Sequence, residues 1–295
     1  MSGPLEFTGE RFTPECVREI WYEHFHRYIL ARELVANLDV LDAACGDGYG
    51  SALLSGPAAS VTGVDVSASA IEHAQNRYAS GSLEFRVADC LDLPFDDDRF
   101  DCIISFETLE HLEDHDRLMQ AFRRVLKPGG FLVVSTPDKA VYTDRQKNDN
   151  EYHVRELYRG EFEDLLGRYF PAYRLLGQKL MFQSAIWSLG NAGGVKFHQE
   201  EEGKVGSFNV PHHDPVYLIA ICAADESSLP PEIAGLSLFD DAAESVYQHY
   251  NDEIGKHIAA GELLAEQEKT LEALKARLES TTPPPRWWNR WFGKS

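Results

Sequence analysis

The chain has 295 residues, of which 43% are hydrophobic, and its 48 Asp and Glu residues against 28 Lys and Arg give a formal net charge of −20. This composition is too apolar for a disordered chain, and the length fits one large domain with an appendage or two small domains. The acidic balance argues against nucleic acid as a partner, because binding a polyanion depends on Lys and Arg that neutralise phosphates.

Hydrophobic patterning predicts strands that alternate with helices. The strands are expected at 39–45, 60–66, 83–87, 100–105, 131–136, 173–183 and 215–223. The helices are expected over 18–38, in a short segment after Gly50, after a cap at Ser67, at 114–126 and at 155–169, and residues 188–214 are expected to be irregular. This alternation predicts an α/β fold with a doubly wound, mainly parallel seven-stranded sheet that is covered on both faces.

The residues beyond a proline boundary at 229–231 have a different composition. Residues 240–279 are rich in Glu, Lys, Ala and Leu, and we expect a C-terminal helical extension, either a coiled coil that joins copies of the chain or a helix packed on the domain. A Pro-rich linker and a tail with Trp and Arg follow at 280–295. Trp combined with basic residues is typical of interfacial membrane anchors. We therefore expect 286–292 to contact a membrane surface or a partner protein, with an unstructured end as the alternative.

The location of the protein is predicted from three features of the sequence. No run approaches 18 consecutive apolar residues, which excludes a spanning helix, and residues 1–6 lack the basic and apolar regions of a signal peptide. The five cysteines are an odd number without close metal-like spacing, which indicates reduced thiols in a chain without an export signal. We expect a cytoplasmic protein, peripheral at the inner face of the membrane if 286–292 anchors it.

Glycine and acidic residues follow the first three predicted strands. Gly46 and Gly48 lie in a loop where the backbone can approach a ligand, Asp65 can accept both hydroxyls of a ribose, and Asp89 can accept from an adenine amine. Ligands of parallel sheets bind at these strand ends, so the pattern predicts an adenosine site. The glycines alone also fit a tight turn without a ligand. As a dinucleotide fingerprint their third glycine would fall at Ser51, which disfavours an NAD-dependent oxidoreductase.

Six segments together resemble the ordered motifs of class I S-adenosylmethionine-dependent methyltransferases. They are 39–48, 63–65, 88–95, 100–105, 109–112 and 124–130. One departure is Ala44, which stands where the first motif has a glycine. The resemblance implies a Rossmann-like fold and divides the chain into an N-terminal helical segment or lid (1–38), a cofactor-binding domain (39–228) and the extension and tail described above.

The resemblance also implies which residues hold S-adenosylmethionine. They are Asp42, Ala44, Gly46, Gly48, Asp65, Val66, Asp89, Cys90, Ser105, Phe106 and Glu107. Asp42 would lie near the ammonium group, Asp65 at the ribose hydroxyls and Asp89 beside the adenine. Residues 105–107 would line the wall near the sulfonium, since a carboxylate and an aromatic face both favour a nearby cation. Arg27 could close over the cofactor's carboxylate, with a solvated helical face as the alternative.

The acceptor is predicted from less specific segments. Residues 9–15, 23–28 and 150–157 resemble bacterial methyltransferases found with cell-surface polysaccharide synthesis, of the O-antigen type, which implies O-methylation of a sugar in a surface glycan or its precursor. A small-molecule phenol, quinone or lipid is the alternative acceptor. A degenerate cofactor-binding fold that serves as an assembly scaffold is the alternative outside the class.

Two histidines are the candidate catalytic residues, because an imidazole titrates near neutral pH and can accept the proton of a hydroxyl. His111 follows the fourth predicted strand, near the expected methyl group, and a helix-capping role is its alternative. His153 follows the fifth strand, where substrate usually enters. His198 with 212–214 is too irregularly spaced to predict a metal site, and no metal is expected.

Overall fold

The computed structural model describes residues 19–281 except 149, 187, 189, 191–193 and 234. It divides into two compact units, Met1–Phe239 and Asp240–Ser295. Residues 1–18 of the expected lid and the expected contact segment 286–292 lie outside the described residues.

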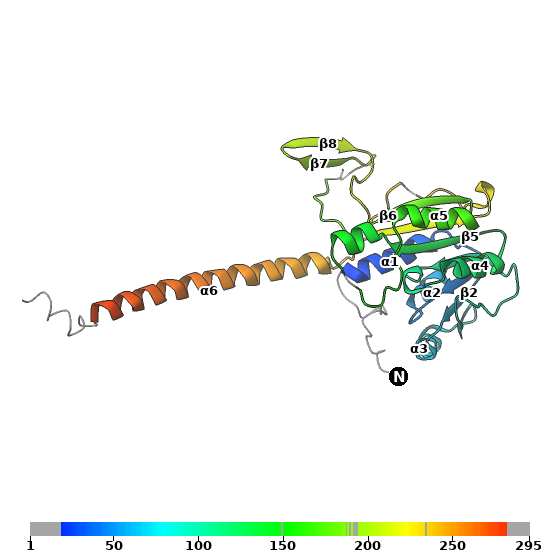
Figure 1. Cartoon of the computed structure of the whole chain (residues 1–295), viewed down its shortest axis with the longest axis horizontal. Helices are drawn as coiled ribbons and strands as arrows, with labels where there is room; N and C mark the ends of the chain where they lie inside the picture. The colour runs from blue at the N-terminus through cyan, green and yellow to red at the C-terminus, as the bar shows by residue number, and fades with distance from the viewer. Residues whose placement is uncertain are drawn as a thin grey trace, which may run out of the picture. The chain divides into compact units, whose positions relative to one another are not determined.

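The first unit is built on a seven-stranded sheet with the strand order β3-β2-β1-β4-β5-β9-β6 (Figure 1). Its strands are β1 (Asp39–Ala43), β2 (Ser60–Asp65), β3 (Leu83–Val87), β4 (Phe100–Ser105), β5 (Leu126–Pro137), β6 (Ala172–Gln178) and β9 (Tyr217–Ala223). The first five strands pair in parallel, and β9 is antiparallel to both β5 and β6. The prediction of a doubly wound, mainly parallel, Rossmann-like sheet with seven strands is confirmed. The strand order reverses between β1 and β4, where ligands bind in open parallel sheets.

Helices cover both faces of this sheet. They are α1 (Glu19–Arg32), α2 (Tyr49–Leu54), α3 (Ala68–Tyr78), α4 (His115–Val125) and α5 (Arg159–Tyr169). Successive strand residues point to opposite faces: Ile103 packs in one apolar cluster with α4 and α5, whereas Cys102 and Ile104 pack in the other with α1, α2 and α3. Ser67 caps α3 as predicted, with its hydroxyl accepting from the backbone N–H of Ala70.

Residues 188–214 were predicted to be irregular, and this is wrong for part of the segment. Strands β7 (Phe197–Glu201) and β8 (Lys204–Phe208) form a separate antiparallel hairpin. Neither strand has a fully buried residue, so no apolar alternation marks them in the sequence. The turn holds Glu202 and Gly203 at φ of 52° and 79°, and a glycine in a two-residue turn was the available signal.

The boundaries of two further elements also differ from the prediction. β6 ends at Gln178 rather than near 183, and α5 begins at Arg159 rather than 155. A π-helical turn, η2 (Ala140–Arg145), and a 3-10 turn, η1 (Leu109–His111), were not expected. Both short turns follow strands of the sheet, and η1 carries one of the candidate catalytic histidines.

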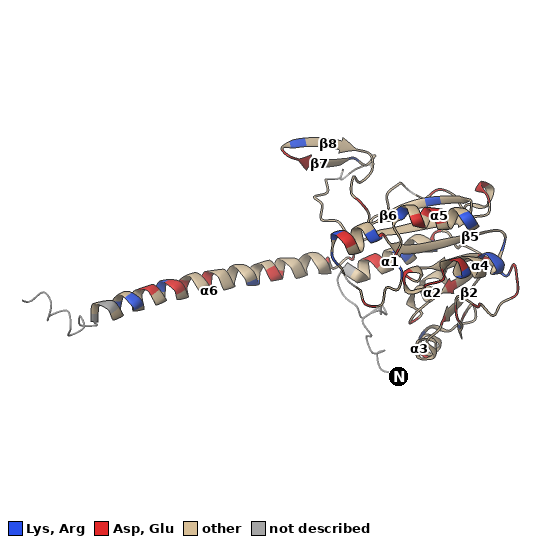
Figure 2. Ribbon diagram, in the orientation of Figure 1, with Lys and Arg blue, Asp and Glu red and all other residues tan. Residues whose placement is uncertain are grey.

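The second unit contains the helix α6 (Ser245–Thr281), which begins inside the expected helical extension at 240–279 and ends two residues beyond it. Its apolar side chains are largely exposed, with Leu264, Leu271 and Leu274 at 60%, 53% and 58%. Acidic and basic side chains follow one another along its C-terminal half (Figure 2). None of the helices in the described residues combines the length and the apolar character needed to cross a membrane.

Candidate active site

The glycine loop after β1 turns through three left-handed residues. Ala44, Gly46 and Gly48 have φ of 61°, 56° and 87°. A Cβ on Gly48 would lie 2.7 Å from the Cβ of Ala74, so this position requires glycine for space as well as for conformation. Ala44 adopts a conformation that costs an L-residue about 1–2 kcal/mol, which explains why glycine suits this position.

Backbone groups hold two acidic side chains beside this loop. The backbone N–H of Gly46 donates to Oδ2 of Asp65 (3.0 Å), and that of Ser67 donates to Oδ1 (2.8 Å). The backbone N–H of Leu91 donates to Oδ1 of Asp89 (2.8 Å). The carboxylates are thereby oriented before any ligand binds, and each oxygen can accept further bonds. This arrangement suits the hydroxyls and amine of an adenosine.

Asp42 is fully buried and does not line the cavity beside the loop. Its oxygens accept hydrogen bonds from Ser51 Oγ (2.6 Å) and from the Tyr28 hydroxyl (3.1 Å). Burial raises the pKa of Asp42 to about 7, while these two hydrogen bonds lower it. The hydrogen bonds of Asp42 join α1 and α2 to β1. Its place near the cofactor's ammonium group, which the resemblance implies, stays a prediction.

A cavity of about 780 Å³ opens at the carboxyl ends of the strands. Ten of the residues predicted for the site line it, namely Ala44, Gly46, Asp65, Val66, Asp89, Cys90, Phe106, Glu107, His111 and His153. Asp42, Gly48, Ser105 and Arg27 are absent from its lining, and each of these four is buried. The volume lies in the usual range for small-molecule sites.

Arg27 is buried rather than on a solvated helical face. It is 1% exposed, its Nη1 donates to Gln178 (2.7 Å), and the same atom lies 3.9 Å from Glu107 Oε1. Its Nε and Nη2 have no hydrogen-bond partner within the described chain. Glu107 in turn accepts a 2.6 Å bond from the Ser135 hydroxyl. A buried guanidinium with unsatisfied donors favours an anionic ligand group nearby.

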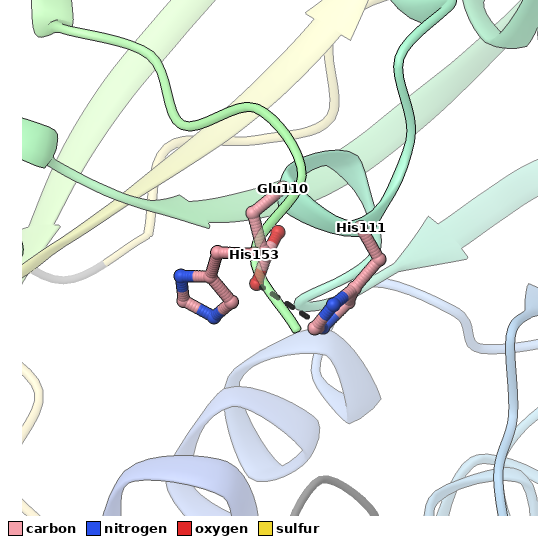
Figure 3. A group of neighbouring side chains, drawn as sticks. All are labelled: Glu110, His111 and His153. Atoms are coloured by element: carbon pink, nitrogen blue, oxygen red, sulfur yellow. Dashed lines mark ion pairs between the residues drawn. The ribbon is translucent and has the colours of Figure 1, made fainter. Parts of the chain in front are cut away.

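Glu110, His111 and His153 converge on one point of the cavity wall (Figure 3). One potential ligand atom from each side chain lies within 4.8 Å of the other two. His111 Nε2 is 4.0 Å from Glu110 Oε1, and the two imidazole centroids are 5.2 Å apart. Glu110 is 1% exposed, and burial, followed by repulsion from Glu107, raises its pKa well above the usual value.

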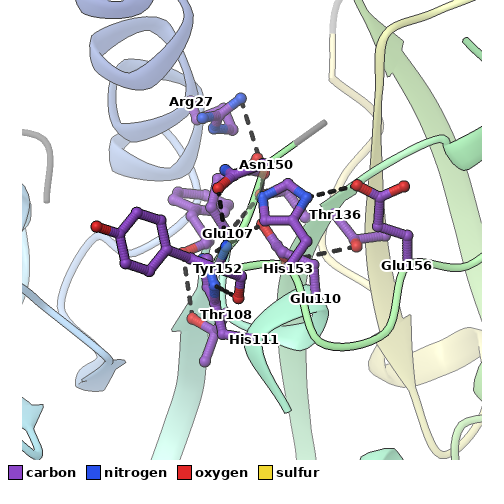
Figure 4. A network of polar contacts seen from close by, with 12 residues as sticks. Arg27, Glu107, Thr108, Glu110, His111, Thr136, Asn150, Tyr152, His153 and Glu156 are labelled. Carbon is purple, nitrogen blue, oxygen red and sulfur yellow. Dashed lines mark hydrogen bonds and ion pairs between the residues drawn. The ribbon is translucent and has the colours of Figure 1, made fainter. Parts of the chain in front are cut away.

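A surrounding network fixes both imidazoles (Figure 4). His111 Nδ1 donates to the Tyr152 carbonyl (3.1 Å), and His153 Nδ1 donates to Glu156 Oε1 (2.5 Å). The Thr143 hydroxyl donates to the other oxygen of Glu156. With Nδ1 of each ring hydrogen-bonded to an acceptor, the neutral tautomer carries its lone pair on Nε2. Both histidines are therefore set to accept a proton or to bind a cation through Nε2.

The structure adds cavity residues that the sequence analysis did not single out. Tyr142 stacks on His153 with centroids 5.3 Å apart, and His24 and Asn150 also line the cavity. Burial, followed by the charge of Arg27, lowers the pKa of His24 well below its usual value. Two of the histidines weighed for a metal make other contacts: His198 hydrogen-bonds to Ser207 in the hairpin, and His212 stacks on Phe208.

Residues 41–134 match a family model described as a methyltransferase domain. A probable S-adenosylmethionine-dependent methyltransferase of Mycolicibacterium smegmatis is 34% identical over 165 residues, covering 55% of this chain and 63% of that protein. A protein of Mycobacterium tuberculosis with the same description is 36% identical over 166 residues, covering 55% and 60%. Methyltransferase GfsG of Streptomyces halstedii is 37% identical over 137 residues, covering 45% of each chain.

This chain therefore spans less than two thirds of the length of these relatives. Residues 41–134 are thus similar to a methyltransferase domain, and the relatives matched over 55% of this chain are described as S-adenosylmethionine-dependent methyltransferases. The cavity described above fits that cofactor chemically. Its oriented acids suit a nucleoside without phosphate, and the carboxylate of Glu107 and the ring of Phe106 line a cavity that would hold a sulfonium.

Proposed function

We propose that the protein is an S-adenosylmethionine-dependent O-methyltransferase that acts on a sugar hydroxyl of a surface glycan or its precursor. One observation supports this most strongly: the same cavity is lined by the cofactor loops, defined as residues 44–46, 65–66 and 88–90, and by two imidazoles that present Nε2. S-adenosylmethionine supplies a methyl group that is bound to a sulfonium. The acceptor oxygen forms a bond to this methyl carbon while the S–CH3 bond breaks, and the electron pair of the broken bond stays on sulfur.

The residues of this chain divide the work of binding and proton transfer. Asp65 accepts from the ribose hydroxyls, and Asp89 accepts from the adenine amine. His153, oriented by Glu156, accepts the proton of the acceptor hydroxyl at Nε2, and His111 contacts the acceptor. Positioning of two reactants in one cavity accounts for much of the rate of such a displacement.

Calorimetric titration with S-adenosylhomocysteine tests the cofactor part of the proposal. Saturable binding with one site per chain is expected, and no heat at high micromolar concentration would contradict the proposal. The acceptor is tested with S-adenosylmethionine that carries a labelled methyl group. Label in a lipid-linked or free glycan supports a sugar acceptor.

A small-molecule acceptor is the second candidate, because relatives include enzymes of that kind. A demethylmenaquinone methyltransferase of Clavibacter sepedonicus is 39% identical over 107 residues, covering 35% of this chain and 44% of that protein. In the same labelled assay, transfer to a quinone or phenol with none to glycans would favour this candidate over the sugar.

We also propose that α6 joins copies of the chain. A helix with Leu264, Leu271 and Leu274 more than half exposed lacks the packing that stabilises most helices, and a second copy would cover them. Light scattering should give a multiple of the monomer mass for the full chain. Replacing the three leucines with Asn should reduce this mass to that of the monomer, whereas Glu262→Gln should not. The tail at 286–292 is proposed as a membrane or partner contact, which vesicle co-sedimentation tests with its three Trp replaced by Ala.

A further inference from the structure

Beyond proton transfer, the Glu110–His111–His153 cluster has the composition of a metal site. Two imidazole nitrogens and one carboxylate oxygen lie within 4.8 Å of one another. In a zinc site each donor lies about 2.0–2.2 Å from the metal, so neighbouring donors are about 3–4 Å apart. Small side-chain rotations would close that difference.

Both histidines also have the hydrogen bonds that metal-ligating imidazoles have. Such imidazoles donate the other ring N–H to a carbonyl or carboxylate, which fixes the tautomer and orients the ring. His111 does so to the Tyr152 carbonyl and His153 to the Glu156 carboxylate. The His111 bond joins segments 41 residues apart, whereas the His153 bond joins residues three apart. The hydroxyl of Thr143 also binds Glu156 and helps to hold its carboxylate in place.

Among the described residues, no Lys or Arg forms an ion pair with the carboxylate of the cluster. Glu110 is 1% exposed, its ion-pair contact is His111, which is charged only when protonated, and its Oε2 accepts a long bond of 3.5 Å from Thr136. A buried carboxylate is costly unless it is paired or coordinates a metal. A cation at this point would offset that cost and bind both Nε2 lone pairs.

We propose that Glu110, His111 and His153 bind one divalent first-row transition-metal cation, and that this cation holds the acceptor hydroxyl. Three protein ligands leave coordination positions open, as in catalytic metal sites, and the cluster lines the cavity. Imidazole nitrogens favour zinc, cobalt or iron over magnesium. The acceptor class is a molecule with a hydroxyl, or two adjacent hydroxyls, that can coordinate the cation.

The role of this site rests on the proposed methyl transfer, whereas metal binding does not. Coordination makes the hydroxyl more acidic, its proton leaves to water, and the oxygen forms its bond to the methyl carbon as the S–CH3 bond breaks. In this arrangement His153 is a ligand and no longer the proton acceptor. The two roles of His153 are therefore alternatives, and removal of metal separates them.

Titration of the chelator-treated full chain with Co²⁺ tests the site, read from the visible absorption of bound cobalt. One Co²⁺ per chain is expected. Its affinity should fall by about 100-fold or more in His111→Ala and His153→Ala, because loss of a ligand's hydrogen-bond partner alone costs about 10–100-fold. His198→Ala, in the hairpin, is the matched control and should bind as the wild type does. Failure of the wild type to bind below 1 mM, or loss of less than threefold in both cavity variants, would overturn the inference.

Two further measurements distinguish loss of the metal site from misfolding of the variant and from failure of the proposed function. Glu110→Gln keeps the side-chain volume and should also weaken Co²⁺, while titration with S-adenosylhomocysteine should give an unchanged affinity in every variant. Cobalt binding without any binding of S-adenosylhomocysteine would overturn the proposed function and leave the metal site standing. Methyl transfer that is fully retained after chelation would overturn the catalytic role of the metal and return His153 to the role of base.

Discussion

The cofactor loops and the Glu110–His111–His153 cluster line the same cavity but are held in place differently. In the loops, Asp65 is bound by the backbone of Ser67, two residues away, and of Gly46 at the end of the neighbouring strand. In the cluster, the backbone N–H groups of Val154 and Arg155 donate hydrogen bonds to the backbone carbonyl of Glu110, which lies more than forty residues earlier in the sequence. The loops are built from short motifs at strand ends, whereas the cluster exists only once distant segments meet.

The largest expected effect concerns the buried carboxylate beneath the cofactor loops. The pKa of Asp42 is about 7 in the folded protein and about 3.9 in an unfolded chain. Because the folded pKa is raised, the stability that protonated Asp42 provides is complete below about pH 4 and is lost as the pH rises to about 7. The loss amounts to about 4 kcal/mol at most, at 1.36 kcal/mol for each unit of pKa.

Asp42→Asn isolates this effect, because the amide oxygen can still accept from Ser51 and Tyr28. Urea unfolding at several pH values should give a wild-type free energy of unfolding that declines relative to the variant between about pH 4 and 7. A constant difference over that range would mean that Asp42 titrates normally in the folded protein. It would also mean that the buried Asp42 does not differ in its titration from the cavity-lining acids Asp65 and Asp89.

The next effect is on cofactor affinity. Asp65→Ala removes two hydrogen bonds from ribose hydroxyls to a charged acceptor, each worth about 1.5–3 kcal/mol, and releases the N–H of Gly46. Calorimetry should show S-adenosylhomocysteine binding weakened by roughly 100-fold or more. Asp96→Ala, an exposed acid outside the cavity lining, serves as the control. A change below threefold in Asp65→Ala would contradict the assignment of the loops.

These differences in construction explain what the sequence could predict. The sheet and the loops follow from local patterns: apolar runs define the strands, Gly48 is required at its turn, Asp65 ends β2, and Asp89 follows β3 by two residues. The burial of Asp42 and Arg27 could not be predicted, since it depends on α1 packing across the sheet. The same holds for the cluster. His111 and His153 were each expected in the site. Their convergence with Glu110 on one point depends on contacts between segments far apart in sequence.

Glu156→Gln tests how the His153 ring of the cluster is oriented. The residue orients the His153 ring as a base or as a ligand, so its loss should lower kcat about tenfold, less than the roughly 10²–10⁴-fold that a positioned acid–base group itself contributes. Affinity for S-adenosylhomocysteine should stay unchanged, because Glu156 is not part of the cofactor loops. Thr143→Val, which removes the partner of the other carboxylate oxygen, should give a smaller loss. Equal losses of kcat and cofactor affinity would contradict the separation of the two regions.

The smallest expected effect tests whether the cofactor loops are governed by backbone conformation. Ala44 has φ of 61°, so Ala44→Gly relieves about 1–2 kcal/mol of left-handed strain at a cost of about 0.5–1 kcal/mol in chain entropy. The free energy of unfolding should rise by about 0.5–1 kcal/mol. Asn37 has the same φ of 61°, but asparagine tolerates this region, so Asn37→Gly should give no gain. If Ala44→Gly destabilises the protein instead, the methyl group contributes packing that outweighs the strain, and the departure from the motif is an adaptation of this cavity.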